Sequence, residues 1–148
     1  MTANGKYCCH FSYRFLSLTE RDIRYIGFHN KGAYNADFII SYKRTENENW
    51  IDKKIDWFAA GRGTDKCSNQ YAYPNKLFDL RKAKIPQGSL VTVKVKAQGG
   101  LGSGKAKRSS GVFRFHPEAT RYAQYQSGGT SLSVKINNPE TSTNLSQV

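Results

Sequence analysis

The amino-acid sequence predicts an all-β fold, an antiparallel sandwich of two β-sheets. Apolar and polar residues alternate with a period of two over much of the chain, as in strands that bury one face. β-Branched and aromatic residues fill these stretches, and clusters of Gly, Pro, Asn and Ser separate them. The chain has 148 residues, the length of a single domain, and 38% of them are hydrophobic, enough to form a core.

Three segments show the alternation most clearly, and each reads as a half-buried strand: 34–42, 91–97 and 132–136. Further strands are expected where shorter apolar or aromatic stretches lie between turns: 7–16, 23–28, 51–58, 77–80, 112–115 and 121–125. One short helix at most is expected, around residues 17–24. Many short strands separated by turns are typical of a β-sandwich.

The predicted domain covers residues 1–137, and residues 138–148 are expected to form a flexible tail because their composition becomes polar. No apolar run reaches the roughly 18 residues of a transmembrane helix. The first residues lack the apolar stretch of a signal peptide. The sequence is therefore compatible with a cytoplasmic protein, a protein released by a non-classical route, or a mature form that has lost its signal.

Basic residues are unevenly distributed. The chain has a net charge of +12, and residues 81–135 contain 11 basic residues and one acidic residue, Glu118. Such a block attracts polyanions. The predicted partners are anionic lipid, a sulfated glycan or an acidic mineral surface. Nucleic acid is less favoured because no RNP-like octamer is found. Lysines on outward strand faces can also serve only to prevent edge-to-edge aggregation.

The candidate polyanion-binding residues lie in and around the Gly-rich loop 98–111: Lys94, Lys96, Lys105, Lys107, Arg108, Arg114 and Arg121. The loop glycines would allow an anion to approach the backbone closely: Gly99, Gly100, Gly102 and Gly104. The loop approximates a phosphate-binding P-loop, but Ala106 stands where the Mg²⁺-binding hydroxyl is needed. Nucleotide hydrolysis is therefore not expected, and no other catalytic motif is found, so no enzyme is predicted.

The three cysteines, Cys8, Cys9 and Cys67, cannot all pair within one chain, and reduced thiols are the simplest expectation. Cys8-Cys9-His10 lacks the second ligand pair of a structural zinc site. Neither a metal nor a cofactor is therefore predicted.

Residues 28–42 resemble the opening strand of the C-terminal β-sandwich domain of the cholesterol-dependent cytolysins, with His29, Gly32-Ala33-Tyr34, Ala36 and Phe38 in the matching order. Gly129-Thr130-Ser131-Leu132 is similar to that family's Gly-Thr-Thr-Leu loop, whose Thr-Leu pair recognises sterol and falls here on Ser131 and Leu132. Loop 98–111 has neither the Trp nor the Cys of the family's membrane-sensing loop. The resemblance implies the fold and the placement of loops at one tip of the sandwich; it does not imply sterol binding or pore formation.

Three functions remain open at this stage. The first is a non-enzymatic module that docks on polyanionic surfaces through the basic Gly-rich loop. The second is a lectin-like or sterol- or membrane-recognition module that uses Thr130, Ser131 and Leu132. The third is a structural or matrix protein that associates with itself.

Overall fold

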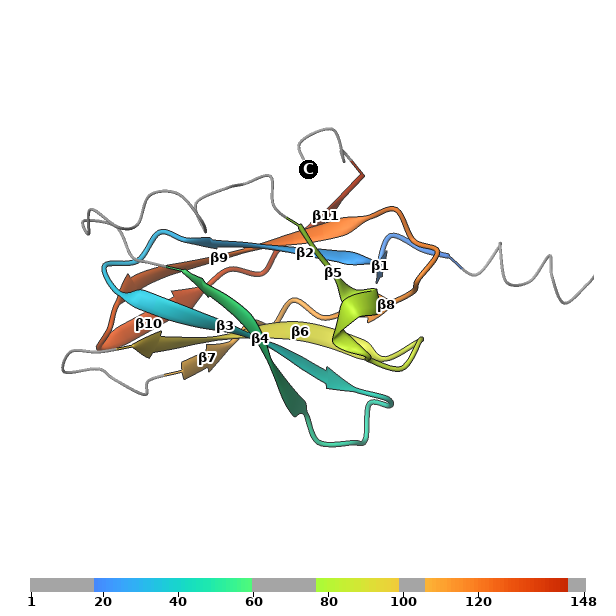
Figure 1. Cartoon of the computed structure of the whole chain (residues 1–148), viewed down its shortest axis with the longest axis horizontal. Coiled ribbons are helices and arrows are strands. Elements are labelled where there is room, and N and C mark those ends of the chain that lie inside the picture. Colours follow the sequence, from blue (N-terminus) through green and yellow to red (C-terminus); the bar gives the residue numbers. More distant parts are fainter. Residues whose placement is uncertain (1–17, 60–76, 99–105, 144–148) are drawn as a thin grey trace, which may run out of the picture.

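The computed structural model describes residues 18–59, 77–98 and 106–143 (Figure 1). These residues form short and medium strands and a single turn of 3₁₀ helix, named η1. The elements are β1 (Asp22–Ile23), β2 (Tyr25–Asn30), β3 (Asn35–Lys43), β4 (Ile51–Ala59), β5 (Leu77–Asp79), η1 (Leu80–Ala83), β6 (Leu90–Gln98), β7 (Ala106–Arg108), β8 (Phe113–Phe115), β9 (Tyr122–Thr130), β10 (Ser133–Ile136) and β11 (Thr141–Ser142).

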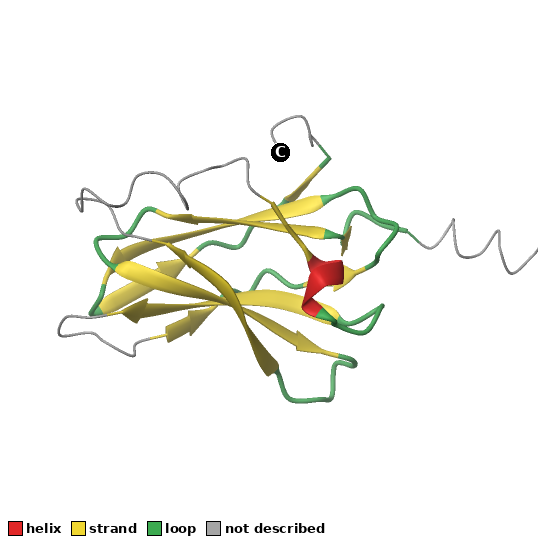
Figure 2. Cartoon of the chain, in the orientation of Figure 1, coloured by secondary structure: helices red, strands yellow, loops and turns green. Residues whose placement is uncertain are grey.

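The strands form two sheets that pack face to face (Figure 2). One sheet has the order β1-β8-β6-β3-β4, with β7 beside β6, and the other has the order β10-β9-β2-β5, with β11 beside β9. This arrangement confirms the predicted all-β sandwich. All of the predicted strands that fall on described residues correspond to strands of the structure, although their ends shift by a few residues.

Strand pairing is mixed, whereas the sequence predicted an antiparallel sandwich. Strand β2 runs parallel to β9 along its whole length, from Tyr25 opposite Tyr122 to Asn30 opposite Ser127. Strand β1 runs parallel to β8. A period of two shows which face of a strand is buried but carries no information about the direction of its partner. The parallel pairs join segments far apart in the chain, so their direction could not be predicted.

The core lies between the two sheets and contains most of the apolar residues of segments 34–42 and 91–97, whereas in segment 132–136 Val134 and Ile136 are partly buried against it and Leu132, expected on the buried face, is exposed. Fully buried side chains come from β2, β3, β6, β8 and β9: Ile26, Phe38, Ile40, Val91, Val93, Val95, Phe113, Ala123 and Tyr125. Phe28 and Phe38 connect the two sheets through rings with centroids 4.7 Å apart. Burial of each large apolar side chain contributes about 1.5–3 kcal/mol, so this shared interior holds the sheets together.

The prediction of a helix at residues 17–24 is wrong for its described part, residues 18–24. This part forms a turn followed by β1, because the Asp22 carboxylate accepts hydrogen bonds from the backbone N–H and the hydroxyl of Thr19, at 2.5 and 3.1 Å. This side chain-to-backbone bonding favours a turn over a helix. The 3₁₀ helix η1 lies elsewhere, capped by Asp79 and ended by Lys84 in the left-handed conformation. The expected strand 7–16 lies outside the described residues.

Part of the segment predicted to be a tail packs on the sandwich. Strand β11 pairs with β9, and the Thr141 hydroxyl donates to the backbone carbonyl of Glu20 at 2.9 Å. Pro139 is buried against Gly111: a Cβ added at Gly111 would lie 2.6 Å from Cδ of the proline ring. Within the described residues, no helix has the length and apolar character needed to cross a bilayer.

Candidate functional site

One end of the sandwich is formed by two neighbouring loops, the turn between β2 and β3 and the hairpin turn between β9 and β10 (Figure 1, left). We call residues 31–34 and 128–133 together the tip. The loops are brought together because β2 and β9 are parallel neighbours that end at the same level, with Asn30 opposite Ser127. The hairpin then returns with Ser133 opposite Thr130.

The buried side chain of Asn30 joins the two loops. Its amide nitrogen donates to the carbonyl of Tyr34 at 2.6 Å. Its amide oxygen accepts from the backbone N–H of Gly32 at 2.9 Å and from the Ser127 hydroxyl at 2.8 Å. Asn30 is only 7% exposed, so these bonds are made away from water, where losing one is most costly.

Three further bonds cross from the turn to the hairpin. The backbone N–H of Lys31 donates to the Ser127 carbonyl at 2.9 Å, and that of Ala33 donates to the Gly129 carbonyl at 3.1 Å. The Tyr34 hydroxyl donates to the Gly128 carbonyl at 2.8 Å. Burial raises the pKa of Tyr34 and outweighs the opposing hydrogen bond with Ser127, so the phenol keeps the proton that it donates.

Two glycines are required by this geometry. A Cβ at Gly32 would lie less than 3.0 Å from the Tyr34 ring. Gly129 has a φ of +79°, and a Cβ there would lie less than 3.0 Å from the Ser133 carbonyl oxygen. Both contacts are closer than a side chain tolerates, and a positive φ favours glycine. The Gly-Ala-Tyr and Gly-Thr-Ser-Leu motifs therefore build the tip.

Leu132 lies in the turn between β9 and β10 and is 61% exposed. Among the described residues it is one of two large hydrophobic side chains that are exposed, the other being Ile51 at 45%. Ile51 begins β4 opposite Tyr42, near the far end of β3. The tip and the adjoining part of β10 also carry hydroxyl groups and lysines: Thr130, Ser133, Lys31 and Lys135 are exposed, and Ser131 is half-buried.

Lys94 and Arg108, two of the predicted polyanion-binding residues, both contact the Asp52 carboxylate. Lys94 Nζ lies 2.7 Å from one oxygen, and Arg108 Nη2 lies 3.2 Å from the other, which also accepts from the Ser41 hydroxyl. Partial burial opposes ionisation of Asp52, but the bonds from Lys94, Ser41 and Arg108 and the charge of Lys94 outweigh it and lower the Asp52 pKa. Part of the positive charge of this pair is thus neutralised within the fold.

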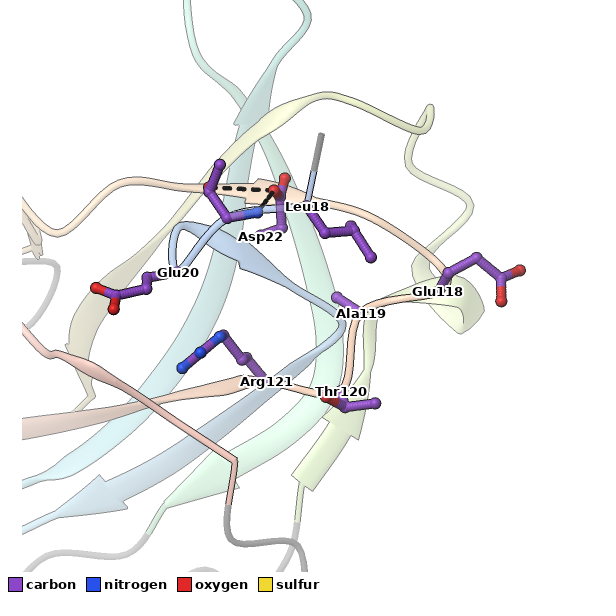
Figure 3. Close-up of a pocket in the computed structure, with 8 residues that line it drawn as sticks. Leu18, Glu20, Asp22, Glu118, Ala119, Thr120 and Arg121 are labelled. Atoms are coloured by element: carbon purple, nitrogen blue, oxygen red, sulfur yellow. Dashed lines mark hydrogen bonds between the residues drawn. The ribbon is translucent and has the colours of Figure 1, made fainter. Parts of the chain in front are cut away.

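Arg114 and Arg121 lie at the other end of the sandwich from the tip. Arg114 stands opposite Leu90, the first residue of β6, whereas β6 ends beside the tip. Arg121 lines a hollow of about 420 Å³ whose wall also carries three carboxylates, from Glu20, Asp22 and Glu118 (Figure 3). A polyanion approaching Arg121 would meet these acidic groups.

Lys96 and Lys107 are exposed; Lys96 lies in the half of β6 that ends beside the tip, and Lys107 is the middle residue of β7. The two lysines face different sides of the sheet. Lys107 stands opposite Val95 and so lies on the face that Val95 turns toward the core. Lys96 follows Val95 in β6 and therefore lies on the other face. The six predicted cations that fall on described residues therefore do not form one surface. Lys105, Gly99, Gly100, Gly102 and Gly104 lie outside the described residues.

Sequence reasoning missed Lys31 and Lys135 as candidate residues. Lys31 lies between the predicted strands 23–28 and 34–42, and Lys135 lies in the predicted strand 132–136, but only the pairing of β2 with β9 and of β9 with β10 brings them to the same end. Within the described part of the chain, no group of three or more His, Cys, Asp or Glu residues is arranged to hold a metal ion.

No family model matches the chain, and no curated protein sequence is similar to it. Among solved structures, the chain is similar to the crystal structure of listeriolysin O, with 17% identity and a TM-score of 0.39 over 80% of this chain and 22% of that one. It is also similar to the membrane-binding domain of pneumolysin, with 13% identity and a TM-score of 0.36 over 77% of this chain and 93% of that one. The chain thus spans about a fifth of listeriolysin O.

A structure of pneumolysin is a third similar structure, with 12% identity and a TM-score of 0.34 over 82% of this chain. Listeriolysin O and pneumolysin are cholesterol-dependent cytolysins, so these structures agree with the resemblance noted in the sequence.

Proposed function

We propose that the chain is a non-enzymatic binding module that docks on anionic lipid surfaces through its tip. The observation that carries this proposal is the exposed Leu132 in the hairpin turn of the tip, at the same end of the sandwich as the exposed Lys31 and Lys135. A single exposed leucine is ordinary on a protein surface. An exposed leucine in the turn of a hydrogen-bonded tip, at an end of the sandwich that also carries lysines, has the chemistry of a contact with the lipid headgroup and acyl-chain boundary.

The apolar and electrostatic contributions are comparable in size. Burying a leucine side chain contributes about 1.5–3 kcal/mol. Each lysine near an acidic membrane contributes about 1 kcal/mol. Neither contribution alone gives strong binding, so docking requires anionic lipid and weakens with added salt.

The proposal selects among the partners compatible with the sequence. A sulfated glycan, an acidic mineral or nucleic acid would engage the lysines but leave Leu132 in water. A neutral glycan or a sterol would contact Thr130, Ser131 and Leu132 without using the lysines, and binding would be insensitive to salt. Self-association would bury Leu132 of one copy against another and would not require lipid.

Co-sedimentation with phosphatidylcholine vesicles, with and without phosphatidylserine, tests the proposal. The chain is expected to bind only the vesicles that contain phosphatidylserine, and Leu132→Ala is expected to weaken binding about tenfold, or roughly 1.4 kcal/mol. Ile51→Ala is the matched control, because Ile51 is exposed away from the tip. Equal binding to both vesicles, or equal losses in the two variants, would contradict docking through the tip.

A further inference from the structure

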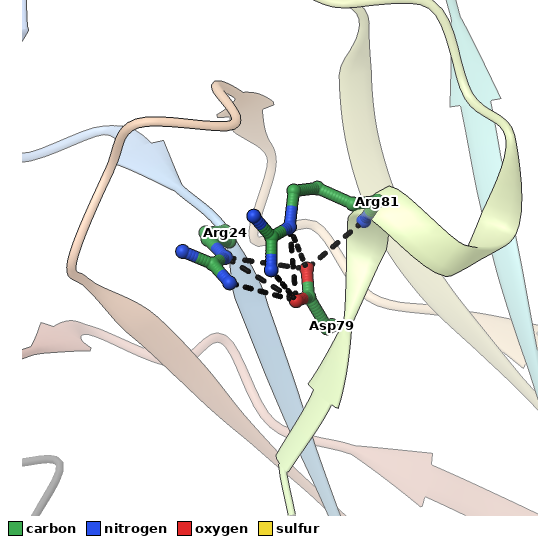
Figure 4. Close-up of polar contacts among 3 residues, drawn as sticks. All are labelled: Arg24, Asp79 and Arg81. Carbon is green, nitrogen blue, oxygen red and sulfur yellow. Dashed lines mark hydrogen bonds and ion pairs between the residues drawn. The ribbon is translucent and has the colours of Figure 1, made fainter.

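Two arginines converge on one carboxylate at the end of β2 opposite the tip (Figure 4). Nη2 of Arg24 lies 3.0 Å, and Nη2 of Arg81 lies 2.8 Å, from the same oxygen of Asp79. The Nε groups of both guanidiniums also donate to this carboxylate, at 3.0 to 3.3 Å. One negative charge is therefore shared by two positive charges, and the cluster keeps a net charge of +1.

The backbone holds these three side chains in place. Asp79 stands opposite Tyr25 in the β2–β5 ladder, and the N–H of Leu80 donates to the Arg24 carbonyl at 2.8 Å. Asp79 also caps η1 by accepting from the Arg81 N–H at 3.1 Å. The Arg24 guanidinium lies over the Tyr25 ring, 4.8 Å from its centre. The guanidiniums are thus oriented before any ligand binds, which lowers the entropic cost of binding.

Hydrogen-bond donors remain on both arginines. A guanidinium has five N–H groups, and Asp79 engages those on Nε and Nη2. Among the described residues, no acceptor is recorded for Nη1 of Arg24 or Arg81. The two side chains are 22% and 50% exposed. The exposed Lys82 and Lys84 follow Arg81 closely in the chain and add positive charge to this segment.

We propose that the Arg24–Asp79–Arg81 cluster binds a tetrahedral oxyanion, namely the phosphate or sulfate group of a small ester. Two adjacent guanidiniums present paired N–H donors that match the oxygens of such a group, and charge-assisted bonds of this kind are the strongest in proteins. The site is separate from the tip, because roughly 17 Å of strand lies between Tyr25 and Asn30. The proposal therefore goes beyond docking on a lipid surface.

Titration of the full chain with inorganic phosphate, glucose 6-phosphate and glucose 6-sulfate tests this site. The titration is monitored by NMR through the ¹⁵N signals of the Arg24 and Arg81 Nε–H groups. Both signals are expected to shift in a saturable way, while glucose shifts neither. The two glucose esters differ only in the anion, so they distinguish a phosphate from a sulfate ligand. Arg81→Gln is expected to weaken binding about tenfold, whereas Lys82→Gln on the same turn changes it less than about twofold.

A second variant, Arg24→Lys, keeps the charge but removes the planar fork, and it is also expected to weaken binding. Arg81 is half-exposed, so Arg81→Gln is expected to fold, as an unchanged thermal midpoint would show. Absence of a saturable shift with all three anions would overturn the proposal, as would equal weakening by Arg81→Gln and Lys82→Gln, or wild-type binding in Arg24→Lys. Arg81→Gln leaves vesicle binding through the tip unchanged, so the two proposals fail independently.

Discussion

The Tyr34 hydroxyl donates a hydrogen bond to the Gly128 carbonyl at 2.8 Å, joining the turn after β2 to the hairpin that presents Leu132. Tyr34 is 6% exposed, so its ring packs in the core while its hydroxyl reaches the tip. Tyr34 lies in the Gly-Ala-Tyr motif that resembles the cytolysin domain. Its structural role here is to fix the position of the candidate site.

Removal of this hydroxyl tests how firmly the tip is held. Tyr34→Phe is expected to lower the free energy of unfolding by about 1–2 kcal/mol, because the Gly128 carbonyl loses a partner in a partly buried place. Tyr122→Phe is the control, because this half-buried tyrosine has no recorded hydrogen bond from its hydroxyl to another described residue. Urea unfolding measures both variants, and an equal effect of the two would show that the bond to Gly128 contributes nothing.

The close approach of Gly32 to Tyr34 gives a second prediction. Gly32→Ala places a methyl group against the Tyr34 ring and is expected to destabilise the protein by about 1–3 kcal/mol. Gly128→Ala is the matched substitution, because a Cβ added there would meet no atom within 4 Å and its φ is not positive. Thermal unfolding of the two variants should separate them clearly. A neutral Gly32→Ala would mean that the ring moves aside without cost.

The ion pairs of Asp52 predict a pH dependence. The Asp52 pKa is lower in the folded chain than its ordinary value of 3.8, so the carboxylate stabilises the fold above that pH. This stabilisation is lost as the pH falls through the lower pKa of the folded state. Asp52→Asn is therefore expected to reduce stability at pH 7 but to match the wild type well below pH 3.8.

Urea unfolding at several pH values measures this difference. Glu46→Gln is the control, since Glu46 is exposed and has no recorded side-chain ion pair among the described residues. A gap between Asp52→Asn and the wild type that stays constant down to the lowest pH would show that the charge of Asp52 is not what stabilises the fold.

Two sets of cations can be compared directly for docking. The double variant Lys31→Gln/Lys135→Gln is expected to lose about 2 kcal/mol of binding to vesicles containing phosphatidylserine, and its binding should depend less on salt. The double variant Arg114→Gln/Arg121→Gln removes the same charge at the other end and is expected to change binding little. The opposite ranking of the two variants in co-sedimentation would favour the cations predicted from the sequence.

The sequence by itself was sufficient for the sandwich, because burial of one strand face is a local property. Phe38 and Ile40 in one segment and Val91, Val93 and Val95 in another alternate with polar residues, and each alternation could be read without knowing what the strand pairs with. The glycines and turns at the tip were also visible, since Gly32 and Gly129 lie in recognisable turn sequences.

Only the tertiary structure decided which of the basic residues act together. The excess of lysine and arginine in residues 81–135 was evident, but strand pairing carries Lys94 and Arg108 to Asp52, Arg121 to a hollow with three carboxylates, and Lys31 to the same end as Lys135. The physical reason is that electrostatic interactions depend on distance in space. Residues far apart in the chain become neighbours only through the register and direction of the strands that carry them.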